Sequence, residues 1–369
     1  MRILDRYIGK QVLLGTLYAV LVLGLVLLLG NLFKQIKPML VDQKAPLELV
    51  LRFVISVLPL SLMYTIPWGF LSAVLLVFGR LSIDQEITGF RVAGLSLVRI
   101  SAPVFAIGAV LSLASLWLNL NVVPYATASS RQLIYEQAVR DPASLLKPGV
   151  VQADFSGNED TLQKLLIEGR SGEWVNGFHF YVLPKAGARN QDRTYIHAAK
   201  AALRVDSDKS QLRLKLEDAY FETRDPDGKV EMAFAGKAEP LVIDMKNPRS
   251  QKLGLGSMDN AQIRREIEGG AEMSESSKVR YQSEITKRYS FSMACIAFAF
   301  VAVPLGLQKR RRETSSGLMI SLLIGAGYFL ISTLAGQFKT NFAVTAMLWA
   351  PNIGCVLLGM LLFWRARFK

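Results

Sequence analysis

The chain has 369 residues, of which 51% are hydrophobic, and a formal net charge of +13. Residues 123–288 carry 25 Lys/Arg and 24 Asp/Glu (25 − 24 = +1), whereas the rest carry 18 and 6 (18 − 6 = +12). The excess charge therefore lies beside apolar runs and not on a basic face with interleaved aromatic residues, so no nucleic-acid partner is expected. Cys295 and Cys355 both lie in apolar runs, which excludes a disulfide framework and offers no metal-ligand spacing.

Six apolar runs are long enough to cross a membrane, whose ~30 Å hydrocarbon core takes about 20 helical residues. In chain order they are Val12–Phe33, Leu49–Phe78, Ile100–Val122, Tyr289–Leu307, Gly317–Gln337 and Met347–Trp364. The first run is too long for a signal peptide and no small-residue cleavage site follows it, so we expect a retained helix. Pro59 and Pro67 are expected to kink the second.

The basic residues of the short flanks predict the orientation. Outside residues 123–288 there are 18 Lys and Arg residues. Of these, 13 lie on one side of the six runs and 5 on the other. The positive-inside rule then places both termini in the cytoplasm and the polar insert outside it. An even number of spans independently requires both termini to lie on one side.

The insert between the third and fourth spans is expected to be all-β. Leu212, Leu214 and Leu216 alternate with charged residues, and the turn sequence Asp225–Gly228 follows, which together indicate a hairpin. Further strand candidates are Val150–Phe155, Leu165–Glu168, Phe178–Leu183, Tyr195–Ala201 and Leu241–Met245. Many short strands suggest a sandwich or jelly roll. Helical connectors are expected at Ala126–Arg140, Met258–Ile267 and Ser274–Lys287.

The predicted fold is thus an α-helical membrane protein with six transmembrane helices and an inserted, jelly-roll-like periplasmic domain. The expected division is 1–125 for the first three transmembrane helices, 126–288 for the β domain with its connectors, and 289–369 for the last three helices.

The loop Gly79–Ser101 has apolar residues among charged ones, which indicates an amphipathic helix at about residues 80–94, ended by Gly94. Such a helix is how permease subunits dock on an ATPase, but an ordinary solvated loop fits the pattern equally well. No P-loop motif occurs in the chain, so it is not expected to hydrolyse ATP itself.

The spans contain no Asp, Glu or His, which argues against ion-coupled transport and intramembrane proteolysis. His179 and His197 are too few for a His-based triad or a zinc site, so no catalytic residue, metal or cofactor is expected. Lys34 and Lys37 fit either interfacial snorkelling or contact with a lipid phosphate. Small residues in the first and fifth spans fit a separable helix seam or static packing (Gly24, Gly30, Gly325 and Gly327).

Short segments along the whole chain carry a resemblance. They are Leu4–Ile8, Gly79 with Leu81, Glu86–Thr88, Ala93–Ser96, Pro148–Val150, Glu284 with Arg288, Val303–Leu305, and Trp349 with Asn352. Together with the three-plus-three layout around a β insert, they resemble the LptF/LptG permeases of the bacterial lipopolysaccharide export machine. Most segments favour an LptF-like subunit, although the start of the chain looks more like LptG.

The resemblance implies a permease subunit that pairs with its sister permease on a dimer of the ATPase LptB, which binds the ATP. It implies extraction of lipopolysaccharide from the inner membrane and transfer to LptC and an LptA-type periplasmic bridge. It places the ATPase-coupling contact at Ile83–Ala93, with Glu86 as the main candidate beside Asp84, Ile87 and Arg91. It places the lateral gate at the first and fifth spans, where the lipid-binding candidates are Gly30, Phe33, Lys34, Lys37 and Phe329.

Two other functions remain open from the residues alone. A lipoprotein-release-type permease would also be powered by an ATPase, but it would have four spans. A membrane scaffold that only recruits partners would make no contact with lipopolysaccharide.

Overall fold

The computed structural model describes residues 2–37, 47–140, 149–153, 161–171, 174–184, 193–206, 211–225, 229–237, 241–244, 254–269, 274–307, 316–338 and 340–367. The chain divides into two compact units. Met1–Lys34, Val50–Ser130 and Gly254–Lys369 form the helical unit, and Gln35–Leu49 and Arg131–Leu253 form the sheet unit. Each unit has a hydrophobic core of its own. The expected boundaries at residues 125 and 288 remain a prediction.

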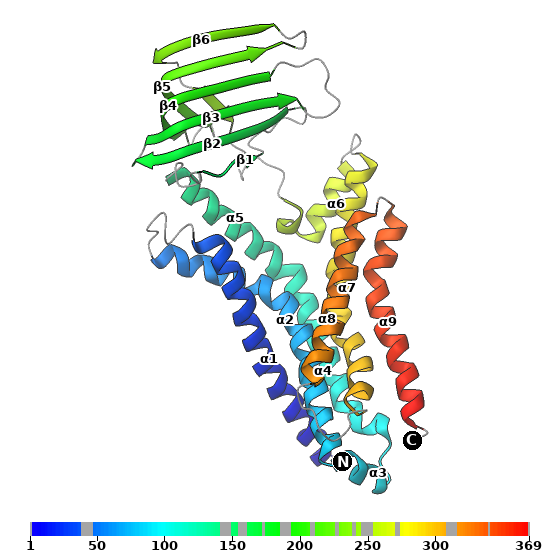
Figure 1. Ribbon diagram of the computed structural model, residues 1–369. Helices are drawn as coiled ribbons and strands as arrows, with labels where there is room; N and C mark the ends of the chain where they lie inside the picture. Colours follow the sequence, from blue (N-terminus) through cyan, green and yellow to red (C-terminus); the bar gives the residue numbers. More distant parts are fainter. Residues whose placement is uncertain are drawn as a thin grey trace. The chain divides into compact units, whose positions relative to one another are not determined.

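The helices are α1 (Arg2–Lys37), α2 (Leu47–Ile83), α3 (Glu86–Val92), α4 (Leu97–Trp117), α5 (Val123–Arg140), α6 (Asn260–Gly269), α7 (Glu275–Leu307), α8 (Ser316–Leu334) and α9 (Asn341–Arg367) (Figure 1). A π-helical turn, Leu118–Val122, joins α4 to α5. Within the described residues, six helical stretches are long and apolar enough to cross a membrane, by length and composition. The predicted six spans are confirmed. Several helices extend beyond their apolar runs. For example, α7 begins at Glu275 and so includes nearly all of the expected connector Ser274–Lys287.

Two helices form the centre of the helical unit. In the apolar windows of α2 and α7, 67% and 72% of the residues are buried, against 11% to 33% in the other four spans. Phe70, Phe78, Cys295 and Phe298 are among the side chains of this core, and each is at most 3% exposed. The α1 window, at 11%, is the least covered, so most of its surface is free to meet lipid or another subunit.

A buried polar cluster joins the outer helices to α7. Asn352 of α9 donates to the Ser290 main-chain oxygen (2.9 Å), and the Tyr328 hydroxyl of α8 reaches the same oxygen (3.3 Å). Ser290 Oγ in turn donates to the Leu348 carbonyl (2.6 Å). Association between helices in lipid relies on such interhelical hydrogen bonds and on close packing, because no hydrophobic effect acts between them. The cluster therefore fixes the three helices against each other.

The sheet unit is built from β1 (Gln152–Ala153), β2 (Thr161–Ser171), β3 (Trp174–Pro184), β4 (Arg193–Asp206), β5 (Gln211–Arg224), β6 (Val230–Lys237) and β7 (Leu241–Asp244). All pairs are antiparallel, β1 to β6 pair in sequence order, and β7 joins the β5 edge beside β6. The predicted inserted all-β domain is confirmed, and its described strands form a meander. Asp225 N–H donates to the Lys229 carbonyl (3.0 Å) at the base of the expected β5–β6 hairpin. Residues 154 and 155 of the first expected strand and Met245 of the last lie outside the described residues.

A line of irregular positions crosses the sheet. On each of five neighbouring strands, one residue lies opposite its neighbours by register but is not paired with them in the described sheet. These residues are Glu168, Gly177, Ala199, Asp218 and Gly236. Gly177 and Asp218 have left-handed backbones, with φ of 59° and 52°.

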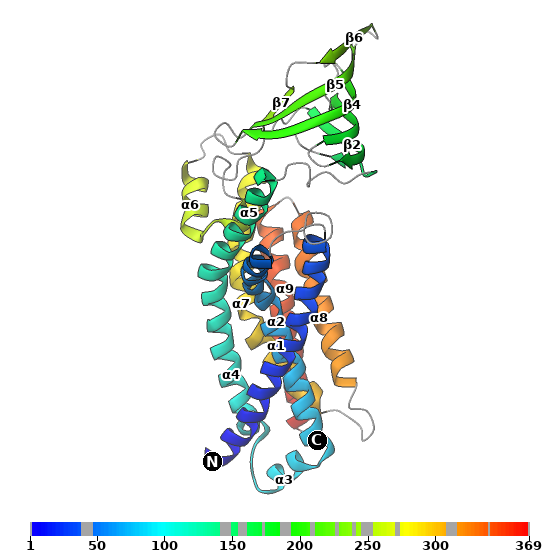
Figure 2. The ribbon, with the colours of Figure 1, turned by 90° about the vertical axis from the view of Figure 1, so that its left-hand side faces the viewer.

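The alternation of buried residues changes phase at this line. In β4, Ile196 and Ala198 are buried before it and Ala201 after it. Residues from both sides of the line join one hydrophobic core. We infer that the sheet bends here, in agreement with the strong curvature of the strands in Figure 2.

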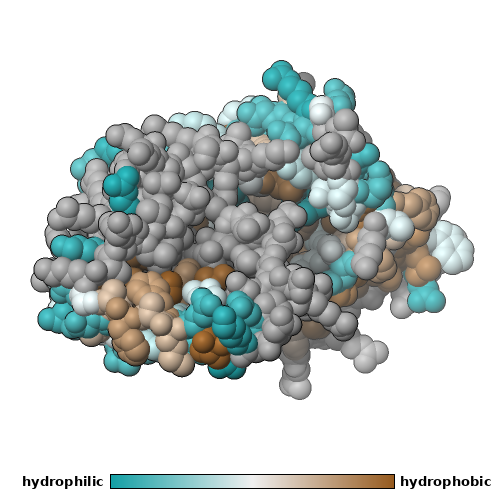
Figure 3. Space-filling view, turned by 90° about the horizontal axis from the view of Figure 1, so that it is seen from above, coloured by the Kyte–Doolittle hydropathy of each residue, from teal (hydrophilic) through white to brown (hydrophobic). Residues whose placement is uncertain are grey.

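The outer strands also carry exposed apolar side chains. Met232 and Phe234 of β6 are 61% and 80% exposed. In the space-filling view of Figure 3, hydrophobic patches lie directly beside hydrophilic ones, as is usual for protein surfaces.

Candidate functional site

Two adjoining cavities lie among the membrane helices of the helical unit. The larger has a volume of about 690 Å³ and is lined by α1, α2, α7 and α8. Its walls are almost entirely apolar, formed by Leu27, Leu60, Ser61, Tyr64, Pro67, Trp68, Phe291, Ala294, Phe298, Gly325, Ala326, Tyr328, Phe329 and Leu330. Phe329 and Leu330 are 49% and 61% exposed, so the α8 wall is accessible from outside the helix bundle.

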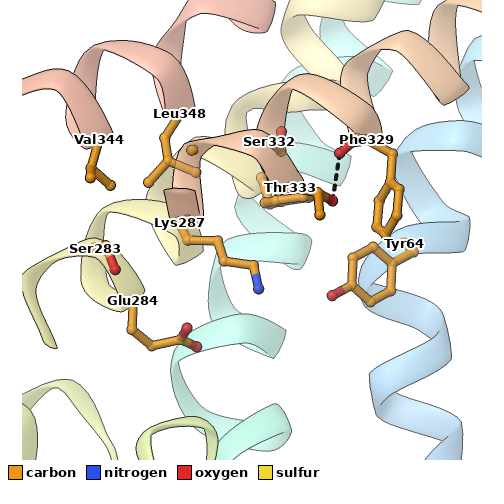
Figure 4. A pocket seen from close by; sticks show the side chains of 12 residues that line it. Tyr64, Ser283, Glu284, Lys287, Phe329, Ser332, Thr333, Val344 and Leu348 are labelled. Atoms are coloured by element: carbon orange, nitrogen blue, oxygen red, sulfur yellow. Dashed lines mark hydrogen bonds between the residues drawn. The ribbon is translucent and has the colours of Figure 1, made fainter. Parts of the chain in front are cut away.

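The smaller cavity, of about 280 Å³, has a mixed wall and is the more polar of the two. Ser283, Glu284, Lys287, Ser332 and Thr333 contribute to its wall (Figure 4). Tyr64, Phe291 and Phe329 line both cavities. The Tyr64 ring packs edge-on against the other two, with centroid distances of 5.6 and 6.0 Å. The three rings thus lie where the apolar cavity meets the more polar one.

Lys287 supplies the positive charge of the polar cavity. Its side chain extends from α7 and ends between Glu284 and Tyr64 (Figure 4). Glu284 is ion-paired with Arg288 (3.6 Å), and in the described part of the chain no acidic group lies within ion-pairing distance of Lys287. A lysine ammonium is a compact point charge with three donors, which suits an anionic oxygen. The arrangement can bind an amphiphile with an anionic head and an apolar tail.

The wall between α2 and α8 depends on one glycine. A Cβ built on Gly325 would lie 2.5 Å from the Trp68 indole. Trp68 Nε1 donates to the Ser321 carbonyl (3.2 Å), which holds the ring over α8. Gly24, Gly30 and Gly327 have no atoms within 4 Å of such a Cβ. Of the four small residues singled out in the spans, only Gly325 is therefore required by close packing in this chain.

The expected amphipathic helix forms, but it is short. The α2 helix continues to Ile83. Gln85 then adopts a left-handed backbone, with φ of 60°, and α3 begins at Glu86. Gly94, with φ of +85° and its N–H bonded to the Arg91 carbonyl, ends it. The helix therefore spans Glu86–Val92 and not about 80–94, because a left-handed residue interrupts it at its start. Ile87 is 6% exposed and anchors α3 to the core.

The polar residues around α3 contact neighbouring elements. Tyr7 of α1 donates its hydroxyl to the Glu86 carboxylate at 3.0 Å. Arg99 of α4 forms an ion pair with Asp5 of α1 (2.5 Å). Asp84 accepts from Arg80 (3.4 Å), which is an exposed pair. A cavity of about 500 Å³ lies at this joint, lined by Ile3, Leu4, Tyr7, Glu86, Phe90, Leu95 and Arg99.

The family model described as "Lipopolysaccharide export system permease LptF/LptG" matches residues 6–365. The chain belongs to the LptF/LptG family. It is therefore a lipopolysaccharide export permease, and its six candidate spans make it a multi-pass membrane protein. A lipoprotein-release-type permease, which would have four spans, does not fit. Among curated proteins no match to the chain was found.

The structure places the other predicted LptF/LptG site residues as follows. Gly30 lies in the exposed half of α1, and Arg91 lies in the last turn of α3. Phe33, Lys34 and Lys37 continue α1, but their side chains lie outside the described part. Phe329 lines both cavities. The roles assigned to these residues, and to Asp84, Glu86 and Ile87, remain predictions.

Lys287 was not singled out in the sequence. It ends the segment Ser274–Lys287, which was expected only to connect the insert to the fourth span, and its position two residues before the apolar run did not distinguish it. The available signal was a lysine at the edge of a predicted span. Which way it faces depends on the rotation of α7, which the sequence did not give.

The two histidines lie on neighbouring strands of the sheet unit. The rings of His179 and His197 are 4.5 Å apart, and His179 Nδ1 lies 2.8 Å from the Tyr195 hydroxyl. Among the described residues no group of three or more His, Cys, Asp or Glu is arranged to hold a metal. Burial, and next the nearby Tyr181, raise the pKa of Tyr195 to about 12.

Proposed function

We propose that this chain is an LptF-like permease subunit of an ABC-type lipopolysaccharide export complex. It extracts lipopolysaccharide from the inner membrane and passes it to a periplasmic bridge, and a partner ATPase supplies the energy. The observation that carries this proposal is that the two cavities share three wall residues, so that an apolar space of about 690 Å³ adjoins a more polar one that contains Lys287.

The chemistry of each cavity matches one part of the lipid. The aromatic and aliphatic wall around Trp68 and Phe298 accepts acyl chain. The Lys287 ammonium binds a headgroup phosphate. The attraction is stronger there than in water because the site borders hydrocarbon. A volume of about 690 Å³ is in the range of ordinary small-molecule sites (~300–1,000 Å³) and below that of a lipid with many chains. The sister permease is proposed to complete the site.

The exposed face of α1 is proposed to border that shared space. Leu21, Val22, Leu25 and Val26 are 59% to 63% exposed in the single chain. An apolar stripe on a membrane helix meets either lipid or another apolar helix. Movement of α1 relative to α8 would open the space laterally, as proposed for the gate.

The remaining assignments follow the same proposal. The positive-inside rule favours an N-terminus and an α3 helix in the cytoplasm, with the sheet unit in the periplasm. The α3 helix would dock on an LptB-type ATPase dimer, which holds the ATP, so the chain itself needs no cofactor. The sheet unit would hand the lipid to LptC and an LptA-type bridge.

Affinity for lipopolysaccharide tests the role of the polar cavity. In the assembled complex, Lys287→Gln is expected to weaken binding about tenfold, because one charge-assisted contact to phosphate is lost. Lys287→Arg keeps the charge and should retain most of the affinity. Lys278→Gln is the matched control, since Lys278 lies on the same helix and pairs with Glu275.

The measurement is a titration of the detergent-solubilised complex with labelled lipopolysaccharide. Equal affinities of Lys287→Gln and Lys278→Gln would remove Lys287 from the proposed site. Loss of binding in both, with folding intact, would point to a general effect of charge at the membrane surface instead.

A further inference from the structure

We propose that Tyr7 and Asp5 are positioning residues that tie α1 to the α3 segment, so that a displacement of α3 moves the exposed half of α1. This inference rests on the proposed function, in which α3 receives the motion of the ATPase. It adds the physical connection between that input and the helix that borders the lipid cavity. The two contacts define what we call the clasp: Tyr7 with Glu86, and Asp5 with Arg99.

The clasp joins segments that are remote in sequence. The Tyr7 hydroxyl lies 3.0 and 3.3 Å from the two carboxylate oxygens of Glu86, 79 positions along the chain. Arg99 pairs with Asp5 across 94 positions. Each contact includes a side chain that can carry a charge, which makes it stronger than a neutral hydrogen bond of the same geometry. They hold the first turns of α1 to the start of α3 and to the first turn of α4, the two elements that the short segment Ala93–Ser96 connects.

Among the described side chains of α1, the buried ones all lie in the first half of the helix. Ile8 and Val12 are fully buried, and Thr16 is 6% exposed. Val20 contacts the Gly69 position so closely that a Cβ there would lie 2.8 Å from its side chain. Beyond Val20, none of the residues up to Gly30 is buried. A helix held along its first half turns a small shift there into a larger one farther along its length.

The α3 segment has a candidate hinge at each end. It is flanked by left-handed residues, Gln85 with φ of 60° and Gly94 with φ of +85°. Hinges are typically a few residues at element ends that absorb backbone rotation. The cavity of about 500 Å³ beside Tyr7 and Glu86 leaves room for displacement at the joint. The clasp would therefore be what makes α1 follow α3.

The first experiment removes one hydroxyl. Tyr7→Phe deletes the hydrogen bond to Glu86 and keeps the ring. Tyr18→Phe is the matched control, because Tyr18 lies on the same helix and is 66% exposed. Both variants are assembled with the sister permease and the ATPase in proteoliposomes. Lipopolysaccharide released, ATP hydrolysed, and the distance between spin labels at Val26 and Leu330 are measured together.

Tyr7→Phe is expected to hydrolyse ATP but to release roughly fivefold to tenfold less lipopolysaccharide per ATP, as loss of one charge-assisted bond allows. The ATP-dependent change in label distance should shrink in parallel, while Tyr18→Phe behaves as the unmodified complex. If both variants match the unmodified complex, the clasp is overturned. If the unmodified complex itself shows no ATP-dependent release, the proposed function fails, whatever the variants do.

A charge swap tests the second contact. Asp5→Arg and Arg99→Asp alone place like charges together, and each should lower release per ATP. The combined variant restores an ion pair and should recover most of it. Recovery is not expected from a residue whose only role is folding of its own helix, so absence of recovery in a stably assembled double variant would contradict the Asp5–Arg99 contact.

Discussion

Gly325 of α8 faces the indole of Trp68 on α2 with no room for a side chain, since a Cβ would lie 2.5 Å from the ring. This contact forms part of the wall of the apolar cavity. The two helices can therefore approach at this point only because position 325 has no side chain. The relationship links a single residue to the shape of the proposed lipid site.

Gly325→Val is expected to displace Trp68 into the cavity and to reduce lipopolysaccharide binding about tenfold or more. Overpacking of a well-packed wall typically costs about 1–3 kcal/mol. Gly327→Val is the control, because the same change two residues along the helix meets open space. Equal binding by both variants in the titration of the assembled complex would contradict this account of the wall.

Asn352→Leu is expected to lower the stability of the helical unit by about 1–2 kcal/mol, because the Ser290 and Tyr328 groups lose a buried partner. Asn121→Leu changes the same residue type at an exposed position and should have little effect. Unfolding in detergent, followed by the loss of helical circular dichroism, measures both. A stable Asn352→Leu variant would show that the cluster does not hold α9 to α7.

Gly177→Ala tests the bend in the sheet. The left-handed backbone at Gly177 and the contact of its Cβ position with the Glu168 side chain should make the change destabilising by about 1–3 kcal/mol. Gly169→Ala, on the neighbouring strand, has its nearest atom 3.9 Å away and no positive φ, so it serves as the control. Limited proteolysis of the sheet unit in the full chain reports the difference. Equal protection of both variants would remove the bend as a constraint.

In an alkaline titration, Tyr195 should ionise at a higher pH than an ordinary tyrosine. Burial raises the pKa of Tyr195 to about 12, above the usual value of about 10. The folded state then holds this proton more tightly than the unfolded state, so its contribution to stability is complete below pH ~10 and is lost as the pH rises toward about 12. Tyr195→Phe should remove the late step from the absorbance titration and flatten the stability loss in that range. An unchanged titration curve would show that Tyr195 ionises normally.

Hydropathy was enough to predict the six spans, because apolar runs are a local property of the chain. The alternation of Leu212, Leu214 and Leu216 likewise predicted β5. The phase change at Asp218 was not predictable, since it comes from a left-handed backbone at a residue other than glycine. Beyond that point the simple period of two no longer says which side chains are buried.

The candidate site was less accessible to sequence reasoning. Glu86 was found because it lies in a recognisable loop, but its partner Tyr7 is 79 positions away and is brought there by packing alone. Lys287 was missed because only the rotation of α7 directs it into the polar cavity. Asn352 was noted for its resemblance, yet its hydrogen bonds to α7 and α8 are visible only in three dimensions.

Photo-crosslinking from position 329 tests the central claim most directly. A benzophenone amino acid in place of Phe329, which lines both cavities, should form an adduct with lipopolysaccharide in the assembled complex, and the yield should change when ATP is hydrolysed. The same group in place of Leu357, which is 61% exposed on α9, controls for contact with bulk lipid. The account predicts an ATP-sensitive adduct at position 329 and none that responds to ATP at position 357. Equal, ATP-independent yields at the two positions would contradict it.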